Sequence, residues 1–399
     1  MITKKSKILI IGAGILGLSV ARELVKRGKS DILIIEKESA LGAHASGRNS
    51  GVLHAGVYYP PDTLKAKLCL KGNSLLRAYC RDHHLPLLDC GKVLVAKNEK
   101  ELKALDLIYE RGKGNGARVS YLGEDELEKI EPLATTYEKA VLSKDTAVVD
   151  PNSILAQLKT ELEASKRVFF SFDTSYIKRL NEHTILTSNG ELVFEFMINA
   201  AGSFADKIAH QFGVGKHYRL IPFKGLYKKL IPEKAKQMYH HIYPVPDLEN
   251  PFLGVHFTKS TSGDVYVGPT AIPAFGAENY SGAPSLNKEA VKIALSDAIL
   301  FLKNPKFRKV ALTEPKRYLD YYFFKEAQQL VPGLKMSDIV PSSKVGIRPQ
   351  LVNWESKELV MDFCIEAASH HIHILNAISP AFTSAFAFSE YVIDKYFPS

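Results

Sequence analysis

The hydrophobic pattern of the first 36 residues predicts a strand, a helix and a second strand. Residues 7–11 form a short apolar run that ends at a glycine, which is typical of a buried parallel strand. Residues 14–27 carry apolar side chains at helical spacing, and Gly28 follows as a stop signal. Residues 31–35 form a second apolar run. The three elements together predict a β-α-β unit.

The rest of the chain alternates between helical spacing and short apolar runs, and residues 219–269 turn towards strands. Helices are predicted at 64–83, 99–112, 151–165, 204–212, 286–302, 322–331 and 382–396. Strands are predicted at 93–96, 194–199, 226–231, 254–258, 265–267, 359–363 and 371–375. Nucleotide-type elements therefore occur at both ends of the chain and in its middle.

This order predicts an α/β fold (α+β overall) in which a Rossmann-like nucleotide-binding domain is interrupted by a strand-rich substrate domain. The predicted nucleotide domain comprises residues 1–90, 143–215 and 340–399. The predicted substrate domain comprises residues 91–142 and 216–339. The length of 399 residues also favours two domains over one.

The turn after the first strand matches the pattern G-x-G-x-x-G at Gly12, Gly14 and Gly17. In this pattern the first glycine permits a tight turn, the second lets a pyrophosphate approach the backbone, and the third lets helix and strand pack closely. The backbone amides of Ile15 and Leu16 open the helix, whose N-terminus favours a phosphate. The turn therefore predicts a dinucleotide site.

Glu36 ends the second strand, nineteen residues after Gly17. A carboxylate there accepts hydrogen bonds from ribose hydroxyls and repels a 2′-phosphate, so NADP is disfavoured. Lys37 follows directly and is included in the predicted cofactor site.

Two later segments favour FAD over NAD as the cofactor. Residues 194–206 form an apolar strand that runs into a small-residue turn at Ala201 and Gly202. Residues 376–384 open a helix near the C-terminus, a third segment that NAD domains rarely need. The residues expected at the cofactor in that loop are Pro380, Ala381 and Thr383.

Seven segments carry a resemblance that spans nearly the whole chain. They are SGRNSGVLHAGVYY (46–59), LKAKLC (64–69), HIYPVP (241–246), PFLGVHFT (251–258), VGP (267–269), VGIRPQ (345–350) and NAISPAFTSA (376–385). In these segments and their order the chain resembles the L-2-hydroxyglutarate dehydrogenases and oxidases of the D-amino-acid-oxidase-like FAD superfamily. One departure is that NAISP stands where many superfamily members have glycines.

The resemblance implies FAD as the cofactor and oxidation of a small 2-hydroxy dicarboxylate, L-2-hydroxyglutarate, to 2-oxoglutarate. It places Ser46, Arg48, Asn49 and Ser50 in the flavin loop. It also implies that the electrons pass to a quinone or to oxygen, and that some members contact a membrane without spanning it.

Oxidation of a 2-hydroxy acid requires a carboxylate anchor, a base for the hydroxyl proton and a flavin face shielded from water. Arg348, in the GIRP segment, is the predicted anchor, because a guanidinium meets a carboxylate with two parallel hydrogen bonds. His54 and His256 are the candidate bases, because an imidazole titrates near neutrality. The sequence does not choose between them, and packing roles remain open for both. A second interpretation of His54 is covalent attachment to the flavin.

The second carboxylate of the substrate requires a cation or hydroxyl groups. Lys224, with Tyr227 or Tyr266, is the predicted partner, and a solvated strand position is the alternative for this lysine.

Composition limits the remaining classes of function. The net charge is +9, from 52 Lys and Arg against 43 Asp and Glu, and the basic residues are scattered, so no nucleic-acid partner is expected. The four cysteines form no CxxC pair, and strand alternation would divide His370, His371 and His373 between two faces, so no metal site is predicted. Few cysteines and the absence of a further long apolar run predict a cytoplasmic protein without a transmembrane helix. The resemblance adds the expectation of peripheral contact with the inner face of the membrane.

Other functions remain open at this point. An amine or amino-acid oxidase uses the same fold, and an arginine anchors an amino-acid carboxylate equally well. Malate or glycerol-3-phosphate oxidation, and a flavoprotein that serves RNA modification, are further alternatives.

Overall fold

The computed structural model describes residues 3–247, 253–280 and 288–398 and divides into two compact units. Unit 1 comprises Met1–Asn49, Pro151–Pro222 and Arg348–Ser399, and unit 2 comprises Ser50–Asp150 and Phe223–Ile347. Pro251 and Phe252 of the PFLGVHFT segment, and the predicted helix start at 286, lie outside the described residues.

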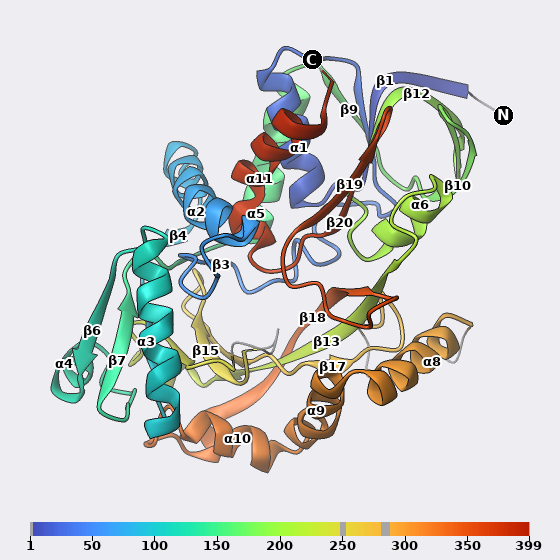
Figure 1. Cartoon of the computed structure of the whole chain (residues 1–399). Helices are drawn as coiled ribbons and strands as arrows, with labels where there is room; N and C mark the ends of the chain where they lie inside the picture. Colours follow the sequence, from blue (N-terminus) through green and yellow to red (C-terminus); the bar gives the residue numbers. More distant parts are fainter. Residues whose placement is uncertain (1–2, 248–252, 281–287, 399) are drawn as a thin grey trace. The chain divides into compact units, whose positions relative to one another are not determined.

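Unit 1 is built on an eight-stranded mixed sheet centred on β1 (Thr3–Ile11) and β12 (Gly190–Asn199) (Figure 1). β1 pairs in parallel with β12 and with β2 (Ile32–Ile35), and β20 (His371–Asn376) runs parallel to β12. The carboxyl ends of these strands therefore share one edge of the sheet, where ligands bind in such folds. The other strands are β9 (Val168–Ser171), β10 (Tyr176–Asn181), β11 (Thr184–Thr187) and β19 (Cys364–Ala368).

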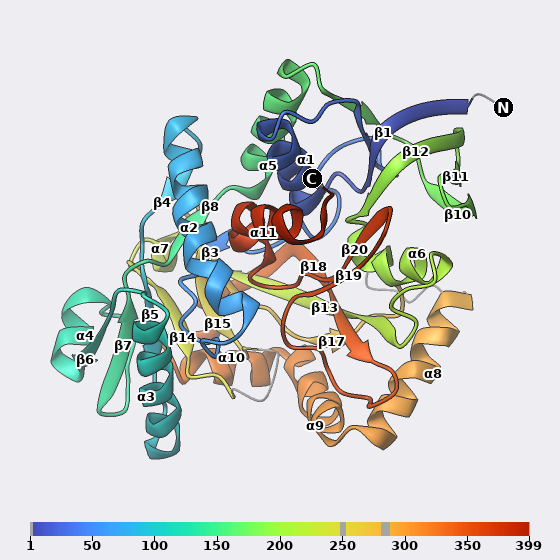
Figure 2. The ribbon, with the colours of Figure 1, turned by 45° about the horizontal axis from the view of Figure 1, so that its top comes forward.

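Helices pack on this sheet through the apolar stripes that the sequence predicts. In α1 (Ile15–Lys26) the side chains of Leu18, Ala21 and Leu24 are buried. This helix packs against α5 (Pro151–Ala164) and α11 (Ala381–Tyr396), as Figure 2 shows. Unit 1 also contains η1 (Gly202–Phe204) and α6 (Ala205–Gln211).

Unit 2 contains most of a nine-stranded sheet, in which β5 (Lys92–Val95) lies between β14 and β7. β5 is parallel to β14 (His241–Pro244) and antiparallel to β7 (Lys139–Ser143). Its other strands are β6 (Val119–Gly123), β13 (Tyr218–Leu230), β15 (His256–Lys259), β16 (Val265–Gly268), β17 (Ile272–Pro273) and β18 (Ile339–Asn353). A small sheet consists of β3 (Val52–Leu53), β8 (Ala147–Val149) and β4 (Leu87–Leu88).

Two helices of unit 2 begin at a residue whose side chain caps the first turn. Thr63 caps α2 (Leu64–Asp82) by accepting a hydrogen bond from the Ala66 amide, and Asn304 caps α9 (Pro305–Thr313) in the same way. The others are α3 (Glu99–Gly114), α4 (Glu124–Ile130), α7 (Pro232–Ala235), α8 (Lys288–Lys303), α10 (Asp320–Gln328), η2 (Glu314–Tyr318) and η3 (Met336–Asp338). In the described ranges, none of the helices combines the length and the apolar character that a bilayer crossing requires.

The predicted α/β fold class is confirmed, and three predictions of detail need correction. Residues 50–90 and 143–150 belong to unit 2, where β3 and β4 both pair with β8, and the later boundaries fall at Pro222 and Ile347 instead of 215 and 339. The strand predicted at 359–363 forms instead at Cys364–Ala368, where it pairs with β20. The strand predicted at 226–231 is the end of the much longer β13, which together with β18 continues from one unit into the other.

Candidate active site

The glycine turn of unit 1 is shaped by close backbone approaches. Gly12 has φ +104°, and a Cβ atom on it would lie 2.6 Å from the carbonyl oxygen of Ala200. A Cβ atom on Gly17 would lie 2.0 Å from the carbonyl oxygen of Gly12. Both positions therefore require glycine, for the reasons that the sequence pattern predicts.

The N-terminus of α1 presents backbone amides beside this turn. Its N-cap residue, Gly14, provides no side-chain cap, and the hydroxyl oxygen of Ser46 accepts a hydrogen bond from the Ile15 amide at 3.0 Å. A Cβ atom on Gly14 would lie 2.9 Å from this hydroxyl. A side chain at position 14 would therefore crowd the N-terminus of α1, whose positive dipole end suits a phosphate.

Glu36 binds the glycine turn through its carboxylate. One oxygen accepts a hydrogen bond from the Ala13 amide at 2.9 Å, and the other accepts one from the Glu38 amide at 3.1 Å. Each carboxylate oxygen has two lone pairs, so ribose hydroxyls remain compatible with these bonds. Lys37 pairs with Glu38 and contacts the His44 imidazole, so its ammonium serves this local network.

The predicted flavin loop is held by its own backbone. Arg48 donates from Nε to the Ala43 carbonyl at 2.6 Å, and Asn49 donates to the Ser46 carbonyl at 2.7 Å. Ser46, Arg48 and Asn49 belong to unit 1, whereas Ser50 is the first residue of unit 2.

The small-residue turn after β12 lies against the glycine turn. The Ala200 amide donates to the Ile11 carbonyl at 2.9 Å, and the Ala201 amide donates to the Asn199 side chain at 3.2 Å. Gly202, at φ +55°, then opens η1. The structure thus places the turn at 200–202, as predicted, beside the end of β1.

A buried chain of hydrogen bonds supports this turn. The Asn199 amide group donates to Nδ1 of His373 at 2.9 Å, which leaves the proton of that imidazole on Nε2. Nε2 then donates to Nδ1 of His371 at 3.0 Å. Burial lowers the pKa of His373 to about 3, so the ring is neutral and suited to this role. His371 and His373 therefore share one face of β20 and have a structural function.

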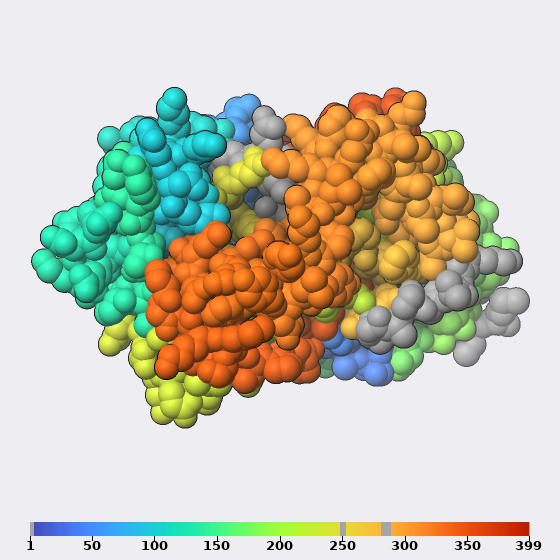
Figure 3. All heavy atoms as spheres, turned by 90° about the horizontal axis from the view of Figure 1, so that it is seen from below, coloured from blue at the N-terminus to red at the C-terminus, as the bar shows by residue number. Residues whose placement is uncertain are grey.

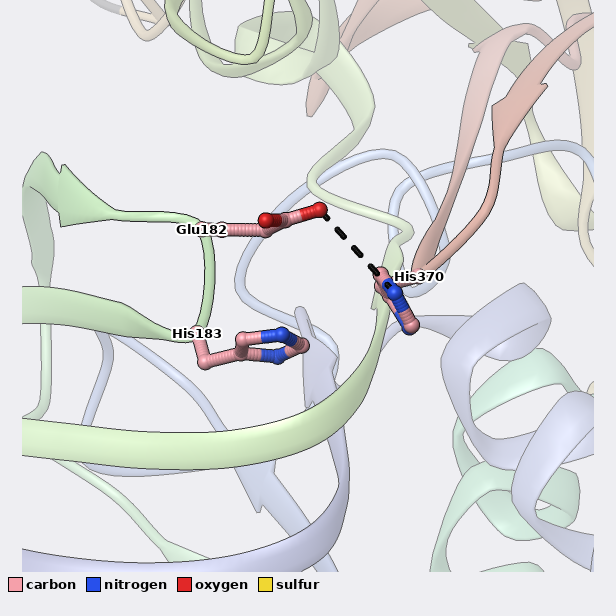
Figure 4. Close-up of side chains that lie close together, drawn as sticks. All are labelled: Glu182, His183 and His370. Carbon is pink, nitrogen blue, oxygen red and sulfur yellow. Dashed lines mark ion pairs between the residues drawn. The ribbon is translucent and has the colours of Figure 1, made fainter.

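His370 lies in the turn before β20, close to Glu182 and His183 (Figure 4). Nε2 of His370 is 4.0 Å from a carboxylate oxygen of Glu182. Two donor atoms on one tetrahedral zinc are about 3.4 Å apart, given bonds of about 2.1 Å. The arrangement thus fits a polar contact between two turns better than a preformed metal site.

The C-terminal loop leads into α11, whose N-cap residue provides no side-chain cap. Its N-cap residue is Pro380, Ala381 is the first helical residue, and Thr383 is buried in the first turn. Because β1 and β20 are both parallel to β12, α1 and α11 begin at the same edge of the sheet. Unit 1 therefore places two helix N-termini at the edge where a dinucleotide binds.

In unit 2 the two candidate bases are held as neutral imidazoles. Nδ1 of His256 donates to the Gly254 carbonyl at 2.9 Å, so its lone pair is on Nε2. Burial, and then the charge of Lys92, lower the pKa of His256 to about 4. Burial, Lys92 and His256 lower the pKa of His54 to about 3. An unprotonated imidazole at neutral pH is what a proton acceptor requires.

Lys92, whose charge lowers the pKa of both imidazoles, is not among the site residues predicted from sequence. It is fully buried on β5, and its Nζ donates to the Tyr58 hydroxyl at 3.0 Å. The predicted strand began one residue later, and nothing in the local pattern separates a buried lysine from a solvated one. His241 also lies in this region, where burial, and then Lys92 and His54, lower its pKa.

The other predicted substrate residues lie on long strands. Arg348, on β18 in unit 1, donates to the Gln350 side chain at 3.4 Å. Lys224, on β13 in unit 2, is buried and donates to Asn279 at 3.0 Å. The ammonium that lies over the Tyr266 ring, at 4.3 Å, is that of Lys344 instead. Lys344 also lies over the Tyr227 ring, at 5.6 Å, so it is a second cation beside the two tyrosines predicted to accompany Lys224.

Comparison with known families decides what the nucleotide site holds. The model of the FAD-dependent oxidoreductases matches residues 7–395, which is almost the whole chain. The chain belongs to the FAD-dependent oxidoreductase family. Its cofactor is FAD, and the glycine turn, Glu36 and the N-termini of α1 and α11 fit its diphosphate and ribose.

Several relatives are similar to this family member along most of their length. The mitochondrial L-2-hydroxyglutarate dehydrogenase of Nematostella vectensis is 34% identical over 97% of this chain and 90% of its own. The human mitochondrial L-2-hydroxyglutarate dehydrogenase is 32% identical over 98% of this chain and 89% of its own. The Escherichia coli K12 enzyme is 34% identical over 97% of this chain and 92% of its own. The resemblance seen in the sequence is thereby confirmed.

Solved structures show the same fold at lower identity. FAD-bound L-alpha-glycerophosphate oxidase from Mycoplasma pneumoniae superposes with a TM-score of 0.75 at 22% identity, covering 98% of this chain and 94% of its own. Glycine oxidase from Geobacillus kaustophilus gives 0.72 at 17% identity, with coverage of 98% and 94%. These likenesses concern the fold alone.

Proposed function

We propose that this FAD-dependent oxidoreductase oxidises L-2-hydroxyglutarate to 2-oxoglutarate. The observation that carries the proposal is the identity of 30% or more, over nearly full length, to L-2-hydroxyglutarate dehydrogenases from bacteria and animals. The neutral imidazoles of the half-buried His54 and the buried His256 support it, because an alcohol gives up its hydroxyl proton to a base.

In the proposed reaction, FAD held by unit 1 would supply the two-electron acceptor for the hydride on C2 of the substrate. His54 or His256 takes the hydroxyl proton. Arg348 binds the carboxylate next to C2, and Lys224 or Lys344 provides a positive charge for the distal carboxylate. Burial lowers the pKa of both lysines, so a carboxylate beside either of them would favour its charged form.

The direct test is an anaerobic absorption spectrum of the purified yellow protein with and without substrate. We expect L-2-hydroxyglutarate to bleach the flavin band and the D-enantiomer to leave it unchanged. A yellow protein that L-2-hydroxyglutarate does not bleach would refute this substrate. Amino acids, malate and glycerol-3-phosphate would then be tried in the same way.

Arg348 provides a first mutational prediction. We expect Arg348→Ala to lower kcat/KM for L-2-hydroxyglutarate about 100-fold, because a charge-assisted bond of roughly 1.5–3 kcal/mol is lost. The flavin content, read from the ratio of visible to ultraviolet absorbance, should stay at the wild-type level. Arg81→Ala is the matched control, because the Arg81 side chain is 62% exposed. Wild-type kinetics in Arg348→Ala would rule out the anchor.

We also propose that the electrons pass to a quinone at an anionic membrane surface, which the protein contacts from the cytoplasmic side. The support is an apolar stripe on α8, where Val291, Leu295, Ile299 and Leu302 are all at least 40% exposed. Their spacing places them on one side of the helix. Figure 3 shows the face that α8, α9 and α10 form in orange.

The charges around this stripe complement an anionic bilayer. On α8 and α9, the exposed charged side chains among those described are all lysines. They are Lys292, Lys303, Lys306 and Lys309. Apolar side chains flanked by lysines are typical of helices that lie in the plane of a membrane interface.

The stripe gives a second mutational prediction. Leu295→Glu combined with Leu302→Glu should weaken cosedimentation with phosphatidylglycerol vesicles about tenfold or more, because two carboxylates replace buried apolar contacts. Turnover with a water-soluble dye as acceptor should not change. Leu107→Glu on α3 is the control, since Leu107 is also exposed but lies on another helix. Unchanged vesicle binding in the double variant would exclude the stripe on α8 as the membrane-binding surface. A wild-type protein that does not bind vesicles would refute the proposed membrane contact.

A further inference from the structure

Lys92 is fully buried at the start of β5, in the interior of the unit 2 sheet. Lysine is almost never found in such a place unless a carboxylate pairs with it. In the parts of the chain that the structure describes, no carboxylate lies within ion-pair distance of its Nζ. Aromatic groups surround it instead: Nζ lies 4.4 Å from the centre of the Tyr58 ring and 5.0 Å from that of Tyr243.

One of these tyrosines is close to His54 in the sequence, and the other packs against His256. Tyr58 follows His54 by four residues and accepts the 3.0 Å hydrogen bond from Lys92. Tyr243, on β14, lies against the imidazole of His256, with ring centres 4.0 Å apart and planes inclined by 34°. One ammonium group therefore contacts one tyrosine that follows His54 in the sequence and one that packs against His256. β5, β14 and β15, which fix these positions, are labelled in Figure 2.

We propose that Lys92 is a positioning residue for both candidate bases, acting through its charge on the two imidazoles and through Tyr243 on the ring of His256. The inference rests on the proposed function insofar as His54 or His256 accepts the substrate proton. It goes beyond that function because it assigns a role to a residue that need not touch the substrate or the flavin.

The sign of the electrostatic effect follows from the charges. A nearby ammonium disfavours a second positive charge, so it lowers the pKa of an imidazole. Burial is the larger cause for both histidines, and Lys92 is the next for His54. The pKa of Lys92 itself is lowered to about 7 by burial. The ammonium is therefore charged below neutrality, which is the range in which an imidazole would otherwise take up a proton.

Other titratable groups face this cluster and act on the same equilibria. They are Cys69 and Lys65 on α2, Cys90 before β5, His241 on β14, Tyr227 on β13 and Lys259 on β15. The thiols of Cys69 and Cys90 have raised pKa values, because they are buried, and stay neutral at physiological pH. Lys92 is therefore the charged group that opposes protonation of both His54 and His256.

The test compares Lys92→Met, which keeps most of the volume and removes the charge, with the wild-type holoenzyme. We expect the acidic limb of the kcat/KM profile for L-2-hydroxyglutarate to move up by about one pH unit, because burial still acts but the ammonium is gone. A purely structural lysine would lower activity at every pH and leave the limb in place.

A second readout does not depend on turnover. Histidine labelled with 13C at Cε1 lets the two imidazoles be titrated by NMR, with His54→Asn and His256→Asn used to assign the signals. Both should titrate at higher pH in Lys92→Met than in wild type. Unchanged titration of both histidines would overturn the inference. A wild-type protein that does not oxidise the substrate would refute only the proposed function, since the titration still tests Lys92.

Lys92→Arg keeps the test decisive where Lys92→Met does not fold. Arginine retains its charge across the whole range, so the imidazoles should titrate no higher than in wild type. An upward move of about one unit in Lys92→Arg would show that the volume of the side chain matters and its charge does not. Tyr58→Phe is the matched control, because it removes the hydroxyl that binds the ammonium and leaves both the charge and the ring.

Discussion

Replacing Gly17 with alanine is expected to yield a protein that binds little or no flavin, with visible absorbance lowered about tenfold or more. The added Cβ atom would lie 2.0 Å from the carbonyl oxygen of Gly12 and 3.3 Å from the Ile10 side chain. Backbone atoms cannot make way as a flexible side chain does, so the turn must move away from α1. The amides that face the diphosphate would move with it.

The matched control is Gly114→Ala, because nothing lies within 4 Å of the Cβ atom that this substitution adds. It should retain full flavin content. Thermal unfolding of both proteins, followed by far-ultraviolet circular dichroism, separates loss of the cofactor from loss of the fold. A Gly17→Ala protein that is as yellow as wild type would contradict the role given to the glycine turn.

Replacing His256 with asparagine is expected to lower kcat by roughly 10²–10⁴ while the flavin stays bound, because a general base contributes about that much. The structure favours His256 because its Nδ1 proton is committed to the Gly254 carbonyl, which leaves a basic lone pair on Nε2. Its lowered pKa keeps this nitrogen free of a proton at neutral pH. Stopped-flow measurement of anaerobic flavin reduction would report the step itself.

His241→Asn is the control from the same region. Nδ1 of His241 accepts a hydrogen bond from the Lys259 amide at 3.0 Å, and its Nε2 meets the Cys90 thiol at 3.2 Å. With both nitrogens engaged, this ring is not suited to take up a proton, and less than a tenfold effect is expected. His54→Asn completes the set. A large loss there with little change in His256→Asn would assign the base to His54.

The nucleotide half of the site could be predicted from sequence because its signals are local. Gly12, Gly14, Gly17 and Glu36 lie within one β-α-β unit, and the backbone requirements of a dinucleotide fix their spacing. The structure places the turn after β12 against the same glycines, as the apolar run before Ala200 predicts. No distant contact needs to be known for these inferences.

The full length of β13 and the whole of β18 were not predicted, because local residue preferences argue against these strands. Pro222 lies within β13, and Pro341 and Pro349 lie within β18, although proline normally argues against a strand. Likewise the apolar pattern of residues 359–363 predicts a strand at that position. The strand forms instead at the less apolar Cys364–Ala368, because these residues pair with β20. Tertiary pairing overrides local preference in both cases.

Lys92 could not be assigned for a similar reason. Its partners Tyr58 and Tyr243 lie 34 and 151 residues away in the sequence, and only the pairing of β5 with β14 brings them together. Lysine at a strand end is normally solvated, so its environment is a property of the assembled sheet.

The division of unit 1 into three separate chain segments has a consequence for how the protein is made. β20 and α11 belong to the last segment, and they supply the neighbour of β12 and a helix that packs on α1. A ribosome therefore releases the glycine turn long before the elements that complete its fold. Until then the apolar surfaces of β12 and α1 are exposed to chaperones and to aggregation. A premature stop codon that removes only the last fifty residues would leave every nucleotide-binding glycine in place, yet the unit that must hold them could not close.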